Sequence, residues 1–314
     1  MKIFITIMMA LFSLTTLAQQ DAGFSMYFFN PVYVNPGYAG SRETLSGSLV
    51  SRSQWTGMSG APGSQSLSVH SAIPNSNVGL GFQFYNDNTG PMKNTGFNLT
   101  YAYHLPVGIK SKLAFGLTGM MNNVRIELDD INVEDENDPA FDGDTYSNWV
   151  FDAGTGLYFY LPRFYFGLSV NHLVQSKFGL DNAPDPNFAK FYRQYYLTSG
   201  IVFHLNETFD FRPSLLMKYV QSAPLVTEIT GSLLVSQKVF VGAGFRTNKR
   251  VNMAGSDNML IGILEFDIAR FLRLGYSYDY YLNRNGKYNN GTHEIMLGWD
   301  IGRTKTKMTN PRYF

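Results

Sequence analysis

The sequence LRLGYSYDY, residues 272–280, alternates large apolar or aromatic side chains with small or charged ones. Such alternation with a period of two predicts a β-strand with one apolar face, because successive side chains point to opposite sides of a strand. Both charged residues of the stretch, Arg273 and Asp279, fall on the polar face. The stretch therefore predicts a strand that separates an apolar environment from a polar one.

The same separation of charged from apolar positions recurs elsewhere in the chain. In residues 260–268, Glu265 and Asp267 alternate with Leu264 and Phe266. A charged side chain on a lipid-facing strand position costs roughly 2–4 kcal/mol at the bilayer midplane, so a membrane favours charge on one face only. We expect these charged residues to face a barrel lumen: Arg212, Lys218, Arg246, Glu265, Asp267, Arg273 and Asp279.

About fourteen such segments occupy residues 44–301, each close to the 9–11 residues that a tilted membrane strand needs. Tight turns such as 162–163 alternate with longer connections such as 87–93 and 123–148. Short periplasmic turns and long external loops are typical of outer-membrane barrels. We therefore predict an all-β fold: a transmembrane antiparallel β-barrel of about 14 strands over 44–301. An even strand number predicts that both termini are periplasmic.

Export and composition agree with an integral outer-membrane protein. Lys2 precedes an apolar run that ends near Leu14, which predicts a signal peptide over residues 1–18. Charged residues make up 16% of the chain, below the usual quarter, and aromatic residues reach 15%. The net charge of +1 argues against nucleic acid as a partner, and the lack of cysteine excludes disulfides and a lipid-modified cysteine.

Alternation alone leaves a second fold open, a soluble barrel or sandwich with its apolar faces turned inward. Two features favour the membrane barrel. Small residues and glycines fall mostly on the charged face, where a crowded lumen would need them. Aromatic residues that suit an interfacial girdle stand near the predicted strand ends, namely Trp149, Tyr195, Tyr219, Tyr280 and Trp299.

The segment 19–43 precedes the first predicted strand and contains two Asn-Pro pairs among many aromatic residues. The residue before a proline is pushed toward extended backbone, so this segment is stiff and not a regular strand. Its aromatic side chains need a surface, and we expect the segment to pack at the periplasmic mouth or bind a partner there. The residues expected to do so are Asn30, Pro31, Asn35, Pro36, Tyr38 and Gly40. The basic tail 302–314 is predicted to be periplasmic.

Two predicted external loops carry candidate sites. The glycine-rich loop after residue 52 has either a contact surface or a conformation packed over the barrel mouth, with Trp55, Gly57, Gly60 and Pro62. The acidic loop 125–148 offers a weak calcium candidate, against the alternative of a solvated loop, at Asp138, Asp142 and Asp144. The five histidines are widely spaced, and no catalytic motif is found, so we predict neither an enzyme nor a cofactor.

Three stretches carry a family resemblance. Residues 20–41 fit the pattern QDxxFSxYxxNPxxxNPxYAGS, QWTGMSGAPGSQSLSVH (54–70) is similar to a second family block, and NPRYF (310–314) is similar to a family ending. The chain thus resembles the PorP/SprF family of the Bacteroidetes type IX secretion system. The resemblance implies an integral outer-membrane barrel in secretion or gliding motility. It also implies partners: a secreted protein or adhesin with a type IX C-terminal domain, and periplasmic secretion-machine proteins.

Two functions remain open at this point. The first is a secretion-associated barrel in outer-membrane lipid that binds or anchors a secreted protein at the cell surface. The second is an outer-membrane channel or transporter for small molecules. Oppositely charged lumen residues could pair and fill the lumen, so conductance across a planar bilayer distinguishes the two.

Overall fold

The computed structural model describes residues 23–127, 145–179, 189–249, 256–283, 286 and 288–302. Over these residues the chain forms a closed barrel of fourteen antiparallel strands, which confirms the predicted fold class. β10 and β11 together make one strand of this wall, interrupted at Val202. The strands are β1 (Leu45–Ser53), β2 (Gly63–Ala72), β3 (Val78–Thr89), β4 (Met92–Pro106), β5 (Lys112–Glu127), β6 (Thr145–Leu161), β7 (Phe164–Asn171), β10 (Gln194–Ile201), β11 (Phe203–His204), β12 (Phe209–Val220), β13 (Leu225–Val235), β14 (Val239–Lys249), β15 (Ser256–Ala269), β16 (Leu272–Tyr281) and β17 (Thr292–Ile301).

The wall closes where the first strand meets the last. β1 pairs with β17 from Leu45↔Ile301 to Ser53↔His293, and β10 pairs with β12. A short hairpin of β8 (Lys177–Phe178) and β9 (Ala189–Lys190) lies in the connection between β7 and β10. No helix among the described residues is long and apolar enough to cross a membrane.

The two ends of the barrel differ in their connections. Connections 73–77, 107–111, 162–163, 205–208, 236–238 and 270–271 share one end, which we call the tight-turn end. The remaining connections lie at the opposite end, which we call the long-connection end. There the connection expected over 87–93 is only Gly90-Pro91, because β3 and β4 continue to Thr89 and from Met92. Added cross-strand pairs therefore replace part of the expected loop.

Burial follows the predicted alternation. Large apolar side chains such as Leu99, Leu117 and Phe151 are exposed on the outer wall. Six of the seven predicted lumen residues are buried, and Asp267 is half-buried next to a register shift near the end of β15. Of the expected girdle residues, four are exposed on the outer wall and Trp299 is half-buried. The apolar face is thus the face turned toward lipid.

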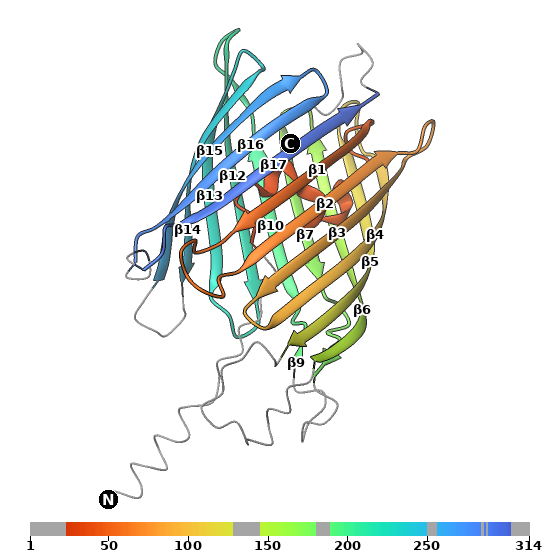
Figure 1. The fold of residues 1–314 in the computed structure, drawn as a ribbon. Coiled ribbons are helices and arrows are strands. Elements are labelled where there is room, and N and C mark those ends of the chain that lie inside the picture. The colour runs from red at the N-terminus through yellow and green to blue at the C-terminus, as the bar shows by residue number, and fades with distance from the viewer. Residues whose placement is uncertain are drawn as a thin grey trace, which may run out of the picture.

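Residues 23–44, which we call the plug, lie inside the lumen. The plug contains two 3-10 turns, η1 (Tyr27–Phe29) and η2 (Pro36–Tyr38), and one helical turn, α2 (Pro31–Val34). Both prolines occupy first helical positions, where the missing N–H is not needed. Figure 1 shows these short helices, in red, inside the ring of strands. The two Asn-Pro pairs therefore produce a folded chain inside the barrel.

The plug crosses the lumen from one end to the other. Gly23 lines the same cavity as Gln54 and Pro62 at the long-connection end, whereas Glu43 forms an ion pair with Lys112 at the tight-turn end. The segment was expected at one mouth only, with both termini on one side. Because the plug adds a further crossing, the first and last described residues, Gly23 and Gly302, lie at opposite ends.

The wall touches the plug backbone at glycines. A Cβ atom added to Gly79 would lie 1.9 Å from the Ala39 carbonyl oxygen, and one added to Gly116 would lie 2.2 Å from the Gly37 nitrogen. Neither contact can be relieved by rotating a side chain, since the opposing atoms are backbone. The glycines on the lumen face of β3 and β5 therefore let the plug lie directly against the wall.

Replacing Gly116 with alanine tests this contact. Overpacking of this kind typically costs about 1–3 kcal/mol, so we expect Gly116→Ala to lower the melting temperature of the purified barrel. Gly119→Ala on the same strand is the control, because a Cβ there meets no atom within 4 Å. Equal melting temperatures for the two variants would contradict the close packing.

Single cysteines test the path of the plug, since the natural chain contains none. Gly23, Glu43, Ser59 and Lys110 are all exposed. We expect Gly23→Cys and Ser59→Cys to react with a membrane-impermeant maleimide from one side of the membrane, and Glu43→Cys and Lys110→Cys from the other. Labelling of Gly23→Cys and Glu43→Cys from the same side would refute the crossing.

Candidate functional site

The start of the plug is held by two buried carboxylates near the long-connection end. The backbone N–H groups of Ser25 and Met26 donate to Glu294, at 2.9 and 2.8 Å. The Ser25 hydroxyl donates to Asp279 at 2.8 Å. Hydrogen bonds to a charged acceptor are about twice as strong as neutral ones, so this is a firm attachment.

Two arginines form ion pairs with these carboxylates and with a third, Glu228. Arg52 bonds Glu294 at 2.9 Å and Asp279 at 2.8 Å, and Arg246 donates to the Ser25 hydroxyl at 2.9 Å and to Glu228 at 2.7 Å. All five charged groups are buried. Removing one partner of a buried ion pair leaves an uncompensated charge, which is strongly destabilising. We call Ser25, Arg52, Glu228, Arg246, Asp279 and Glu294 the long-end cluster.

A second cluster holds the end of the plug. Arg42 binds both oxygens of Asp300, at 2.9 and 3.0 Å, and also donates to the Tyr38 hydroxyl at 3.0 Å. Asp300 also pairs with Arg273 at 3.2 Å, and Glu265 lies 4.0 Å from Arg273. We call Tyr38, Arg42, Glu265, Arg273 and Asp300 the turn-end cluster. The plug is thus fixed by buried charges at both of its ends.

Between the two clusters, the side chain of Asn35 forms hydrogen bonds with backbone groups of the wall and of the plug. Its amide nitrogen donates to the carbonyl oxygens of Leu157 and Leu168, at 2.9 and 3.3 Å, and its oxygen accepts from Gly37 N–H at 2.8 Å. The Ser169 hydroxyl donates to the Val34 carbonyl at 2.6 Å. These bonds satisfy the Gly37 N–H and the Val34 carbonyl of the plug backbone, and they tie the plug to β6 and β7.

Two lumen histidines serve the same purpose. His104 Nε2 lies 2.8 Å from the Ala39 carbonyl oxygen, which can only accept, so Nε2 carries the proton and Nδ1 accepts from the Tyr160 hydroxyl at 3.0 Å. His70 Nδ1 accepts from the Gly40 N–H at 3.2 Å. Both histidines therefore bind the plug backbone. Among the described residues no group of three His, Asp or Glu could hold a metal ion.

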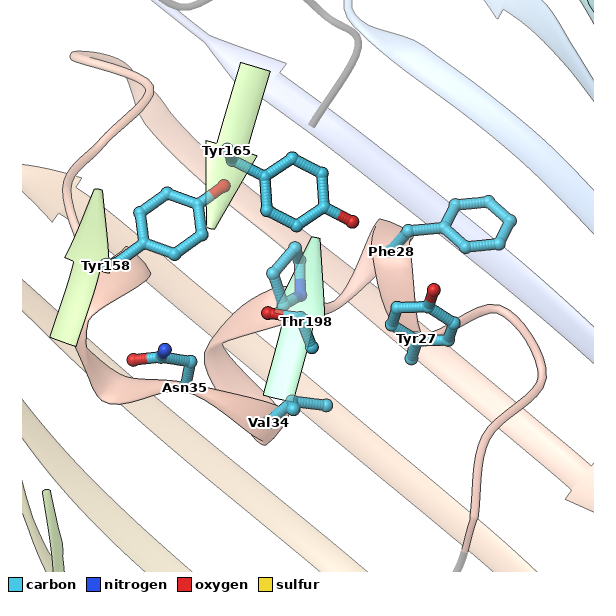
Figure 2. Close-up of a pocket in the computed structure, with 8 residues that line it drawn as sticks. Tyr27, Phe28, Val34, Asn35, Tyr158, Tyr165 and Thr198 are labelled. Carbon is cyan, nitrogen blue, oxygen red and sulfur yellow. The ribbon is translucent and has the colours of Figure 1, made fainter. Parts of the chain in front are cut away.

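Aromatic side chains pack in the lumen between the two clusters. The Arg212 guanidinium lies 5.2 Å from the ring centre of Phe28 and 4.6 Å from that of Phe240. Figure 2 shows Tyr158 and Tyr165 of the wall facing the plug across a cavity of about 20 Å³. A buried water needs about 10–15 Å³, so this gap has room for one water and for no larger solute.

The loop 54–62 is pinned to its neighbours. The N–H of Thr56 donates to the Gly291 carbonyl at 2.9 Å, and the Asn290 N–H donates to the Thr56 carbonyl at 2.8 Å. Trp55, Gly57 and Gly60 have positive φ angles of 50°, 90° and 68°. Two of these are glycines, which adopt such angles without strain. The loop therefore has one defined shape over the long-connection end.

The functional residues predicted from the sequence do not form a single site. Tyr38 and Arg273 belong to the turn-end cluster, whereas Arg246 and Asp279 belong to the long-end cluster. Asp138, Asp142 and Asp144 lie outside the described residues. The sequence did not predict the cluster roles of five further residues: Arg42 of the plug, and Arg52, Glu228, Glu294 and Asp300 of the wall. Glu294 and Asp300 alternate with Ile295, Leu297 and Trp299 in the sequence, which is typical of a polar strand face, but nothing in the sequence indicates that the plug binds them.

Solved structures with a similar fold are outer-membrane barrels. The CymD monoaromatic hydrocarbon channel aligns with a TM-score of 0.52 and 11% identity, over 91% of this chain and 94% of that one. The Ralstonia pickettii toluene transporter TbuX aligns with a TM-score of 0.50 and 10% identity, over 86% of this chain and 92% of that one. No curated protein matches the sequence significantly. At such low identities the likeness shows the fold alone.

A family model provides the assignment. The model described as the type IX secretion system membrane protein PorP/SprF matches residues 16–299. The match covers the plug, the long-end cluster, the turn-end cluster except Asp300, and nearly the whole barrel. The chain therefore belongs to the PorP/SprF family of type IX secretion system membrane proteins.

Proposed function

We propose that this protein is a non-enzymatic, non-conducting component of type IX secretion or gliding motility. In this proposal it binds or anchors a secreted protein, such as an adhesin, at the cell surface through that protein's type IX C-terminal domain. Family membership supports a general role in type IX secretion, and the exposed apolar outer wall supports a place in outer-membrane lipid.

The observation that carries the proposal is the filled lumen. The plug is held at each end by buried ion pairs, and its middle lies directly against wall glycines. Moving it would expose Asp279, Glu294 and Asp300 without their plug partners. A barrel closed in this way suits binding at its ends better than passage through its centre.

The alternative function is transport of small molecules. CymD is described as a hydrocarbon channel and TbuX as a toluene transporter, and both share the barrel fold. Such transport here would require displacement of the plug or a path around it. Steady conductance through the barrel would therefore favour the transport function.

In the proposed arrangement the long-connection end receives the secreted protein. The tight-turn end, where Ile109 is fully exposed at a turn, would face periplasmic secretion-machine proteins. This assignment follows the usual rule that short turns of outer-membrane barrels are periplasmic.

Conductance across a planar bilayer tests the closed lumen. The wild-type barrel should show no steady conductance. Glu294→Gln should produce frequent openings, because the new amide NH₂ faces the donors of Ser25 or Met26 and the charge that binds Arg52 is lost. Glu43→Gln, at an exposed position of the same plug, is the control and should remain silent. A large steady wild-type conductance would contradict the proposal.

Gentle detergent extraction from the native outer membrane tests the proposed partner. We expect a secreted protein with a type IX C-terminal domain to co-purify with the wild-type barrel and to be identified by mass spectrometry. A barrel lacking the exposed loop 54–62, rejoined through glycines, controls for binding to the detergent micelle. Repeated isolation of the wild-type barrel without such a protein would contradict the binding function.

A further inference from the structure

One side of β6 lacks a neighbouring strand at the long-connection end. β6 pairs with β5 up to its first residue, at Glu127↔Thr145. On its other side, the pairing of β6 with β7 stops at Thr155↔Val170. Among the described residues, no strand pairs with β6 on this second side beyond that point. We call the backbone of residues 145–150 on this side the open edge.

The chain that follows β7 contacts β6 only close to the point where pairing stops. The Leu173 N–H donates to the Ala153 carbonyl at 2.8 Å, and the Ser176 hydroxyl donates to the Phe151 carbonyl. The β8–β9 hairpin forms a separate two-stranded sheet, and its Phe178 packs on the buried face of the β5–β6 pair. Figure 1 shows β9 beside this end of β6. The hairpin therefore lies against one face of β6 and does not continue the sheet.

The open edge presents backbone groups in the pattern of a strand that has no neighbour. The Ala153 and Phe151 carbonyls point away from β5, toward the chain that follows β7. The backbone groups of Thr145, Ser147 and Trp149 point the same way, because these directions alternate along a strand. All three residues are exposed. A row of N–H and C=O groups about 13 Å long, at roughly 3.3 Å per residue, is thus available for pairing.

The sequence of the open edge has none of the usual protection against strand addition. Natural edge strands are protected by charged residues, prolines or β-bulges. TYSNWV, residues 145–150, contains no charged residue and no proline, and most of its residues favour strands. Its register with β5 is unbroken. Such an edge is a template for a strand of another chain.

The length of β6 places the open edge outside the hydrocarbon layer. β6 has 17 residues, whereas a tilted membrane strand needs about 9–11. Because β6 ends at the tight turn 162–163, the surplus lies at the Thr145 end. Backbone groups without partners are excluded from lipid, which agrees with this placement. The open edge therefore lies at the end to which the proposed function assigns the secreted protein.

We propose that the open edge binds an extended strand of the secreted partner by β-sheet addition, a proposal that rests on the function given above. The added strand would accept from the N–H groups of Ser147 and Trp149 and would donate to their carbonyls. Its side chains would alternate between the two faces of the sheet, and those on the outer face would pack beside Trp149.

A second copy of this chain does not suit the open edge. Strands of outer-membrane barrels are tilted by roughly 35–45° from the membrane normal. In two copies related by a two-fold axis along that normal, the β6 strands would therefore cross at about 70–90°. Paired strands are rotated by only about 20–25° relative to each other, so the two edges would not form a ladder.

Hydrogen exchange of the purified full-length mature barrel tests whether the edge is open. We expect the Ser147 and Trp149 amides to exchange at least about tenfold faster than those of Asn148 and Val150, which point toward β5. Mass spectrometry with residue-level fragmentation measures these rates. Equal protection of all four amides would show that the chain itself covers the edge, and would overturn the proposal.

Proline at the open edge tests partner binding in the native outer membrane. Ser147→Pro removes an N–H that points away from β5, and prolines are tolerated at such edge positions. Ser147→Ala is the matched control, because it loses the hydroxyl that accepts from Asn123 but keeps the N–H. After gentle extraction we expect about a tenfold loss of the co-purifying secreted protein in Ser147→Pro only, since one hydrogen bond is lost and the ring excludes the incoming strand.

Thr145→Pro, at the next position that points away from β5, should act as Ser147→Pro does, and equal melting temperatures of the variants establish that the barrel is folded. Equal amounts of the secreted protein with the proline and alanine variants would overturn strand addition and leave the proposed function standing. Absence of the secreted protein from the wild-type preparation would overturn both.

Discussion

The structure depends on neutralising charge inside a closed barrel. Glu294 is fully buried, and it accepts from two plug N–H groups and from Arg52. Without the plug, the lumen face of β16 and β17 would carry carboxylates whose hydrogen bonds are incomplete. Without the arginines, the plug N–H groups would face unneutralised charge. A buried ion pair is costly unless further hydrogen bonds support it, and here two N–H groups of the plug backbone supply such bonds to Glu294.

The barrel could be predicted from the sequence because its physical rule is local. Lipid excludes charge from one strand face, so a period of two appears in each segment, and Arg273 and Asp279 mark the lumen face without knowledge of their partners. Strand ends were less certain, as 87–93 shows, because β3 and β4 pair beyond the point where their alternation weakens. An even strand number places the two ends of the wall, Leu45 and Ile301, on one side, whereas the plug takes Gly23 to the other end of the barrel.

The site was harder to predict because its contacts join distant parts of the chain. The Asn-Pro segment signalled a stiff, folded stretch that needs a surface, and Tyr38 and Asn35 are buried as that reasoning requires. Its direction through the lumen depends on Ser25 meeting Glu294, 269 positions away. Neither Ser25 nor Gly116 carries a local signal of this role. Serines and strand glycines occur in proteins for many structural reasons. Only the folded structure, in which the plug backbone approaches the wall, shows which reason applies to these two residues.

The position of Glu294 on β17 has a consequence for how the molecule is assembled. The same strand that completes the seam with β1 also supplies the carboxylate that holds the plug. Contacts between residues far apart in sequence are slow to form, because the entropy lost on closing the intervening loop opposes them. The seam with β1 and the plug contacts of Glu294 and Asp300 all depend on this one strand. A chain that stops before its last strand would therefore lack the seam together with these two carboxylates.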